Sequence, residues 1–274
     1  MINKKDILGH SDILTFRGSF DKTNNRTNIL LLLPKTRGPF GIKKFKKLIE
    51  KNFNLLEYDD ILSEQAKIFK QSQTLTFEEK AVAINNALTK CGNVNFHIVC
   101  HSTGCGLGTF LVKTNFKKFK SITLISPWNK VDDEFKSLQK KRIENARALN
   151  SISFLKSEYE LLYTSNYIEK FQKEFYDYIS TQKNKKIDHS FIEKRLKTIL
   201  DCEIGIELYK LELPKLFINA VDDKLMKIHH GQELNKICKN SKLISLKSGG
   251  HMLTETRAKD LNMHISYFIN SIGK

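Results

Sequence analysis

A serine, a pair of aspartates and a histidine occupy three places in the chain from which they could form one catalytic group. Ser102 follows an apolar run, Asp222 and Asp223 follow a second one, and His251 follows two consecutive glycines. A serine hydroxyl is a weak nucleophile until a base removes its proton, and a histidine oriented by a carboxylate is a common base. These residue types therefore predict acyl transfer through a covalent intermediate on the serine.

The segment around Ser102 has the composition of a sharp turn between a strand and a helix. Such a turn pushes the serine above the edge of a sheet and requires small neighbours, which are present here as Gly104, Gly106 and Gly108. The backbone N–H of Thr103, at the start of the helix, would then point at the developing oxyanion. Two other interpretations stay open for this segment: Ser102 as a helix N-cap, and a dinucleotide-binding loop that lacks its third glycine.

The acid and the base follow the serine in the order expected for an α/β arrangement, which is serine, then acid, then histidine. The acid is Asp222 or Asp223, in the loop after the apolar segment Leu216–Ala220. His251 follows Gly249 and Gly250, a flexible pair suited to a loop that holds an imidazole over the serine. Each residue alone could be a turn former or a surface loop residue. Together, in this order and at strand ends, they predict a triad.

Strand-like and helix-like segments alternate over most of the chain, which predicts an α/β fold with a mostly parallel central sheet. The continuous aliphatic run Asn28–Leu33 is typical of a central strand buried on both faces. The predicted strands are Thr15–Phe20, Asn28–Leu33, Asn54–Tyr58, Asn93–Cys100, Ser121–Ser126, Leu216–Ala220 and Lys242–Leu246. The predicted core helices are Lys43–Lys51, Phe77–Lys90, the small-residue helix after Ser102, and Leu261–Ile272.

The alternation stops between Pro127 and about Leu213, where the pattern is almost wholly helical. Residues 128–213 are therefore expected to form a helical cap, or lid, inserted into a core made of residues 1–127 and 214–274. The predicted cap helices are Phe135–Leu149, Ser153–Thr164, Tyr167–Thr181 and Phe191–Leu200. The cap side chains Phe154, Tyr159, Leu162, Tyr163 and Phe171 would either line an apolar pocket with phenolic hydroxyls or pack the cap helices together.

With these motifs the chain resembles the α/β-hydrolase superfamily from about Thr15 to its C-terminus. The segment Ile218–Leu225 looks like the acid loop of that family, in which the second aspartate of such a pair is usually the triad member. The resemblance therefore implies Asp223 rather than Asp222. It also implies a serine hydrolase that needs no cofactor and no metal.

Scattered residues also resemble the enol-lactonase and aminoacrylate-hydrolase branch. These are the Gly249–His251 segment with Thr256 and Asn262, and, at the start of the lid, Ser126, Trp128, Arg142 and Ala146.

The resemblance further implies a second oxyanion donor in the loop after the Asn28–Leu33 strand. The family usually shows His-Gly there, whereas this chain has Leu33-Pro34-Lys35-Thr36. Proline has no N–H, so the donor is expected to be Lys35 or Thr36. Arg37, in the same loop, would either hold a substrate carboxylate or lie exposed.

Composition restricts the partners of the chain. Five cysteines without CxxC spacing argue against a disulfide framework or a structural zinc site and favour a cytoplasmic enzyme. No apolar run is long enough to span a membrane, and no signal segment is expected. The formal charge of +16 would attract acidic partners, but lysine runs without interleaved aromatics do not suggest nucleic-acid binding. The adjacent His229 and His230 are expected to point apart, so no convergent metal set is predicted.

The predicted function is cleavage of a carboxylic ester, thioester or lactone by Ser102, His251 and Asp223, with oxyanion donors at Thr103 and at Lys35 or Thr36. The substrate is a small molecule, or an acyl group carried on an acidic carrier protein, which the basic charge would attract. Two alternatives remain. One is an acyltransferase on the same triad, and the other is a non-catalytic protein of this fold that docks an acidic partner.

Overall fold

The central sheet consists of six parallel strands with one short antiparallel strand at its edge. The computed structural model describes residues 16–17, 25–34, 38–58, 76–182 and 187–272. The strand order is β1-β3-β2-β4-β5-β6-β7, and only the β1–β3 pairing is antiparallel. The strands are β1 (Phe16–Arg17), β2 (Asn28–Leu32), β3 (Asn54–Tyr58), β4 (Phe96–His101), β5 (Phe119–Ile125), β6 (Lys215–Ala220) and β7 (Ser241–Leu246).

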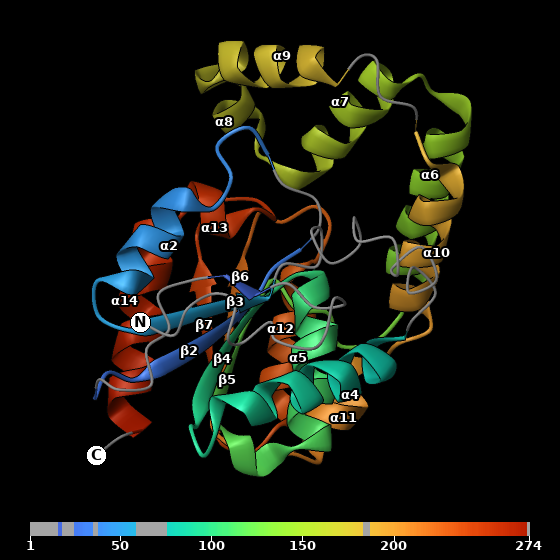
Figure 1. Cartoon of the computed structure of the whole chain (residues 1–274). Helices are drawn as coiled ribbons and strands as arrows, with labels where there is room; N and C mark the ends of the chain where they lie inside the picture. The colour runs from blue at the N-terminus through green and yellow to red at the C-terminus, as the bar shows by residue number, and fades with distance from the viewer. Residues whose placement is uncertain (1–15, 18–24, 35–37, 59–75, 183–186, 273–274) are drawn as a thin grey trace.

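Helices cover both faces of this sheet, and the strands supply each face with alternate side chains. In β2, Leu30 and Leu32 join the core on one face, while Ile29 and Leu31 join the core on the other. This is why the strand is a continuous aliphatic run rather than an alternating one. The helices on the first face include α4 (Phe77–Leu88), α5 (Thr103–Thr114) and α12 (Ile228–Ile237), and those on the second are α2 (Lys43–Glu50) and α14 (Ala258–Ile272) (Figure 1).

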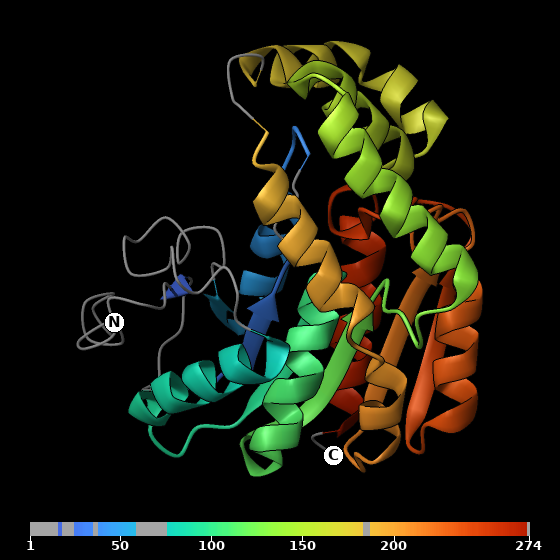
Figure 2. The same ribbon diagram turned by 90° about the vertical axis from the view of Figure 1, so that its right-hand side faces the viewer.

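An inserted helical region lies between β5 and β6. Its helices are α6 (Asp133–Ala148), α7 (Ser151–Leu162), α8 (Ser165–Lys170), α9 (Gln172–Thr181), α10 (His189–Leu200) and α11 (Ile204–Tyr209). Figures 1 and 2 show α7, α8 and α9 beyond the carboxyl ends of the strands, with α6 and α10 running side by side down to the core. The remaining short helices are η3 (Thr89–Cys91), η4 (Phe116–Lys118) and α13 (Leu253–Thr256). We use the word cap for residues 128–213, which contain this insert.

The predicted α/β class and helical insert are confirmed, and the boundaries of the elements differ by a few residues. One predicted helix, Tyr167–Thr181, is two helices, because the chain leaves helical geometry at Phe171 (φ −121°, ψ 34°). At this break the ring of Phe171 packs edge-on against Phe40 of the core, with centroids 4.9 Å apart. The sequence pattern also missed α11 and α12. Of the predicted strand Thr15–Phe20, only Phe16 and Arg17 lie within the described residues.

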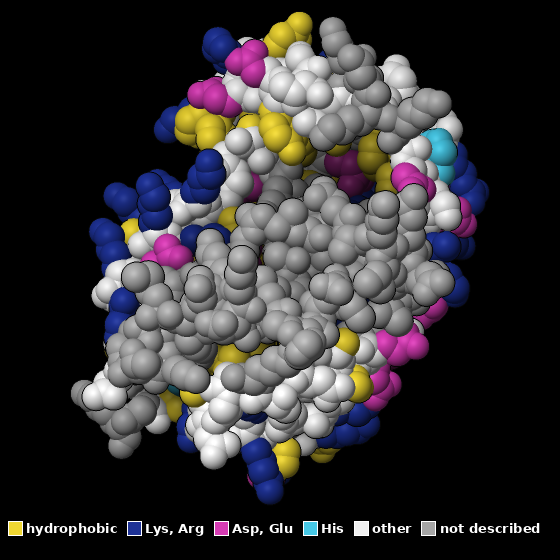
Figure 3. Space-filling model, in the orientation of Figure 1, with side chains coloured by type: hydrophobic (Ala, Val, Ile, Leu, Met, Phe, Trp, Pro, Cys, Tyr) yellow, Lys and Arg dark blue, Asp and Glu magenta, His cyan; other side chains and the backbone are white. Residues whose placement is uncertain are grey.

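No helix among the described residues is both long and apolar enough to cross a membrane. On the face seen in Figure 3, Lys and Arg side chains lie around the periphery and are mixed with Asp and Glu.

Candidate active site

Ser102 sits at the turn between β4 and α5 in a backbone conformation that few residues adopt. Its φ is 54° and its ψ is −121°, which is strained for a residue with a side chain. The turn is held by the Ser102 N–H, which donates to the Ile125 carbonyl at 2.9 Å. Helix α5 then passes close to β2, since a Cβ at Gly104 would lie 2.3 Å from the Leu32 carbonyl oxygen. The sequence prediction of a crowded turn that requires small residues matches this geometry.

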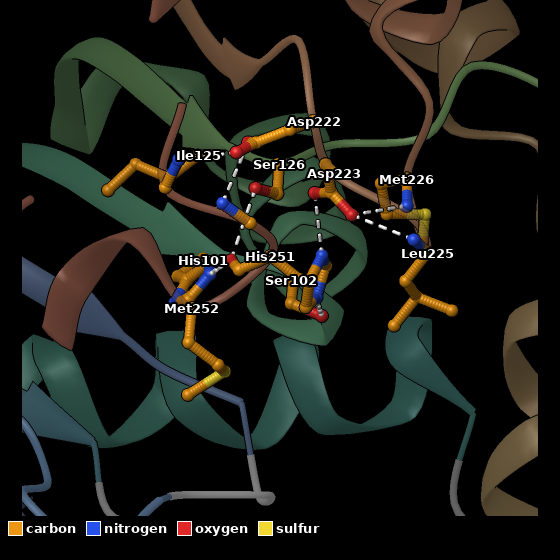
Figure 4. A network of polar contacts seen from close by, with 12 residues as sticks. His101, Ser102, Ile125, Ser126, Asp222, Asp223, Leu225, Met226, His251 and Met252 are labelled. Carbon is orange, nitrogen blue, oxygen red and sulfur yellow. Dashed lines mark hydrogen bonds and ion pairs between the residues drawn. The ribbon is translucent and has the colours of Figure 1, made fainter. Parts of the chain in front are cut away.

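The structure brings Ser102, His251 and Asp223 into one chain of hydrogen bonds (Figure 4). The Nε2 atom of His251 is 2.8 Å from Ser102 Oγ, and its Nδ1 atom is 2.9 Å from Asp223 Oδ2. All three residues are buried, with 5% or less of their surface exposed. The segments that carry them lie far apart in the sequence and meet at the carboxyl ends of β4, β6 and β7.

The two neighbouring aspartates have different partners. Asp223 uses its second oxygen, Oδ1, to accept hydrogen bonds from the backbone N–H groups of Leu225 and Met226, both at 2.8 Å. Asp222 turns the other way and accepts from the N–H groups of Gly249 and Gly250, at 3.1 and 2.9 Å. Asp223 therefore faces the imidazole, while Asp222 ties the acid loop to the loop that carries His251 (Figure 4).

His101, directly before Ser102, contacts the backbone of His251. Its Nε2 atom lies 2.8 Å from the His251 carbonyl oxygen, and its Nδ1 atom lies 3.1 Å from the Thr254 hydroxyl. Burial lowers the pKa of His101 to about 3, so the ring is neutral at neutral pH. Nε2 therefore carries the proton and donates it to the carbonyl, and Nδ1 accepts from Thr254. The sequence suggested only that His101 packs the turn.

The cap contacts the histidine loop directly. The carbonyl of Leu162, at the end of α7, accepts from the N–H groups of both His251 and Met252, at 3.0 and 3.2 Å. One residue further on, the hydroxyl of Tyr163 donates to Glu255 at 2.9 Å, and the other carboxylate oxygen of Glu255 accepts from the Gly38 N–H. Glu255 thus joins the cap, the loop after β2 and helix α13.

Of the expected oxyanion donors, only Thr103 lies within the described residues. Thr103 is the first residue of α5, where helix geometry leaves the leading amides without intrahelical partners. Lys35 and Thr36, the expected second donors, and Arg37 lie outside the described residues.

Two neighbouring thiols, Cys100 and Cys105, are fully buried, and burial raises the pKa of each. They are protonated and packed, as expected of small core residues rather than nucleophiles.

A small cavity of about 30 Å³ opens at Ser102 and His251. Its walls are mostly apolar, but three polar side chains of the cap also line it: Gln139 and Arg142 from α6, and Arg195 from α10. We call these three side chains the cavity roof. Of the cap residues that the sequence suggested for a pocket, Leu162 lines this cavity, whereas Tyr159, Tyr163 and Phe171 belong to an aromatic cluster around Phe175.

The expectation that His229 and His230 point apart is wrong. Their ring centroids are 4.3 Å apart, and both Nε2 atoms face Asp132 Oδ2, at 2.9 Å for His229 and 3.9 Å for His230. They lie in the first turn of α12, and the N-cap residue of α6, Asp132, meets them there. His230 Nδ1 accepts a long hydrogen bond from the Asn129 N–H, so its Nε2 carries the proton. The ligand atoms of Asp132, His229 and His230 lie within 4.8 Å of one another, a grouping of the kind that can hold a metal ion, so the prediction of no convergent metal set is not confirmed.

The α/β-hydrolase fold family model matches residues 57–258, which is most of the chain. The chain belongs to the α/β-hydrolase fold family. This α/β-hydrolase is also 23% identical over 202 residues to a putative carbamate hydrolase, RutD, of Acinetobacter baylyi, an alignment covering 72% of this chain and 76% of that protein.

Solved structures share this α/β-hydrolase's fold at low sequence identity. An enol-lactonase from Burkholderia xenovorans LB400 matches with a TM-score of 0.76 and 14% identity, over 94% of this chain and 96% of that one. A hydrolase from Oleispira antarctica matches with a TM-score of 0.78 and 18% identity, over 98% and 97% of the two chains. An esterase from Thermogutta terrifontis matches with a TM-score of 0.73 and 11% identity, over 95% and 94%.

Proposed function

We propose that this α/β-hydrolase is a serine hydrolase that cleaves a carboxylic ester, thioester or lactone of a small molecule. The observation that carries the proposal is the continuous hydrogen-bonded chain from Ser102 Oγ through His251 to Asp223. The names of similar proteins, which include an enol-lactonase and an esterase, agree with this class of reaction. The RutD likeness adds carbamate as a related bond type.

The geometry supports a two-step mechanism. His251 Nε2 takes the proton of Ser102 Oγ as this oxygen attacks the carbonyl carbon, and then gives the proton to the leaving group. Asp223 keeps the proton of His251 on Nδ1 and stabilises the charged imidazolium that forms. Water, activated by His251 in the same way, then attacks the acyl-serine and releases the acid.

The oxyanion of each tetrahedral intermediate needs N–H donors near Ser102. The Thr103 amide at the start of α5 is the first, since the helix N-terminus also favours negative charge there. The second is Lys35 or Thr36, as the sequence predicts. Because the formal charge of +16 would attract an acidic partner, an acyl group on an acidic carrier protein is a second form of substrate.

The size of the cavity limits the acyl group. A volume of about 30 Å³ holds only one or two water molecules, so a long acyl chain would require the cap to move. We therefore expect the enzyme to prefer short acyl groups.

The test is labelling with a fluorophosphonate probe and turnover of p-nitrophenyl esters of increasing chain length, on the wild type and on Ser102→Ala. We expect labelling of the wild type only, loss of turnover in the variant, and highest kcat/KM for the shortest esters. Circular dichroism shows whether the variant is folded. A folded wild-type protein that neither takes the label nor cleaves any ester of the series would refute the proposal and favour a binding role.

A further inference from the structure

Two consecutive residues of the cap, Leu162 and Tyr163, lie directly against two glycines of the core. A Cβ at Gly38, in the loop after β2, would lie 1.7 Å from the Tyr163 hydroxyl oxygen. A Cβ at Gly250, directly before His251, would lie 3.0 Å from the Leu162 carbonyl oxygen. Cap atoms therefore occupy the space that a side chain would take at either position, and glycine permits this close approach.

The same two cap residues are hydrogen-bonded to the segment that begins at His251. The Leu162 carbonyl accepts from the His251 N–H at 3.0 Å, and the Tyr163 hydroxyl donates to Oε2 of Glu255 at 2.9 Å. Burial, together with the charge of Glu255, raises the pKa of Tyr163, so the phenol keeps its proton and is the donor. The cap thus holds the backbone of the proposed base and a carboxylate four residues beyond it.

Glu255 extends this contact to the loop after β2. Its side chain is buried, and its other oxygen, Oε1, accepts from the Gly38 N–H at 2.9 Å. Gly38 follows the expected second oxyanion donors, Lys35 and Thr36, by three and two positions in the sequence. One buried carboxylate therefore fixes the end of that loop relative to the segment that carries His251.

We propose that Glu255 is a positioning residue, which together with Leu162 and Tyr163 holds the His251 loop and the loop after β2 in their catalytic arrangement. This inference rests on the proposed serine-hydrolase function. The contacts that seat the cap on the core are the same ones that fix His251 and Gly38. A displacement of about 1 Å in a catalytic group can lower the rate about 100-fold, so Glu255 should affect kcat without touching the substrate.

Three substitutions separate the parts of this contact. Glu255→Leu removes both acceptors, so that a buried N–H and a buried hydroxyl lose their partner. Glu255→Gln keeps an acceptor for the Gly38 N–H and offers its own N–H to the Tyr163 oxygen, since a hydroxyl can accept as well as donate. Tyr163→Phe removes only the hydroxyl and leaves the hydrogen bond between Glu255 and Gly38 in place.

Two matched controls separate position from stability. Tyr167→Phe removes a hydroxyl from the same aromatic cluster, since the Tyr167 ring stacks on that of Tyr163 with centroids 5.7 Å apart. Within the described part of the chain, the Tyr167 hydroxyl makes no hydrogen bond. Glu233→Leu removes another core carboxylate that holds the cap, because Glu233 of α12 accepts from the Asn129 side chain at 2.7 Å.

The measured quantities are kcat and KM for p-nitrophenyl acetate, at a temperature where circular dichroism shows every variant to be folded. We expect Glu255→Leu to lower kcat about 100-fold with a change in KM of less than about threefold, and Glu255→Gln to recover most of that loss. Tyr163→Phe should lower kcat about three- to tenfold, as loss of one hydrogen bond to a charged group would cause. Both controls should keep the wild-type kcat even where they lower the unfolding temperature.

A folded Glu255→Leu variant with a wild-type kcat overturns this inference, and so does a loss of kcat that Glu233→Leu reproduces. If Glu255→Leu does not fold, Tyr163→Phe decides, and a kcat equal to that of Tyr167→Phe overturns the inference. In each case the wild type still labels with the fluorophosphonate probe, so the proposed function stands. A wild type that neither labels nor turns over would instead overturn the proposed function, and this inference with it.

Discussion

The side chain of His101 holds the backbone of His251, to which its Nε2 atom donates a hydrogen bond of 2.8 Å. The two residues are separated by 150 positions in the sequence, and their rings lie 5.6 Å apart. The Ser126 hydroxyl donates to the same carbonyl at 3.4 Å, and the Thr254 hydroxyl donates to Nδ1 of His101 at 3.1 Å. The residue before the proposed nucleophile thus holds the backbone of the proposed base, while Ser102 itself contacts the imidazole.

Replacing His101 should therefore slow catalysis without removing any group that touches the substrate. His101→Leu removes the donor to the His251 carbonyl, and we expect kcat to fall about 10- to 100-fold with a smaller change in KM, as a misplaced catalytic group would cause. Thr254→Val removes only the hydrogen bond to Nδ1 and should have a weaker effect. Steady-state kinetics well below the unfolding temperature measures both. An unchanged kcat in folded His101→Leu would show that the His251 loop holds its position without this contact.

The two aspartates of the acid loop should respond differently to the same substitution. Asp223→Asn removes the charge that stabilises the imidazolium, and we expect kcat to fall by about three to four orders of magnitude. Asp222→Asn leaves the triad charge in place and weakens only the hydrogen bonds to Gly249 and Gly250, so a loss of about tenfold is expected. Parallel kinetics on the two variants, at matched stability, gives the comparison. A larger loss for Asp222→Asn than for Asp223→Asn would reverse the assignment made here.

The elements that the sequence predicted best are those whose pattern is local. The β2 strand is a continuous aliphatic run because both of its faces are covered, and the serine turn is marked by the small residues it needs. Both patterns are visible in the local sequence, without knowledge of which segments pack against them. The choice of Asp223 over Asp222 came from a family resemblance, because the local sequence alone does not show which carboxylate faces the imidazole.

The features that the sequence missed depend on contacts between distant segments. The role of His101 requires the position of the His251 carbonyl, and the cavity roof requires α6 and α10 to lie side by side over Ser102. The rings of His229 and His230 approach each other because Asp132, at the start of the cap, faces both Nε2 atoms. The residue pattern within a single helix does not predict such a contact between distant segments.

Two glycines of α5 should differ in their tolerance of a methyl group. A Cβ at Gly104 would lie 2.3 Å from a backbone oxygen of β2, which can move only with the sheet. A Cβ at Gly106 would lie 2.7 Å from the ring of Phe77, which can shift. We expect Gly104→Ala to reduce the free energy of unfolding by about 3 kcal/mol or more and Gly106→Ala by about 1–2 kcal/mol. Urea unfolding followed by circular dichroism measures both, and equal losses would argue against the close approach of α5 to β2.

Buried histidines should make the protein less stable as the pH falls below neutrality. His97 of β4 lies 2.7 Å from the Ser121 hydroxyl, and burial, helped by the charge of Lys120, lowers its pKa to about 4. The unfolded chain, with a histidine pKa near 6.5, binds a proton below that pH while the folded protein does not. The free energy of unfolding therefore falls between pH 6.5 and about pH 4, by about 2 kcal/mol per such histidine from pH 7 to pH 5.

His97→Gln isolates this contribution. Glutamine retains a polar group that can reach Ser121 but does not titrate, so the variant should lose less stability than the wild type on acidification. We expect the difference in unfolding free energy between pH 7 and pH 5 to be smaller by about 2 kcal/mol in the variant. Urea unfolding at the two pH values provides the measurement, whatever the variant's stability at pH 7. If wild type and variant lost equal stability, His97 would have to bind its proton equally well in the folded and unfolded states, and its burial beside Ser121 would have no linkage to pH.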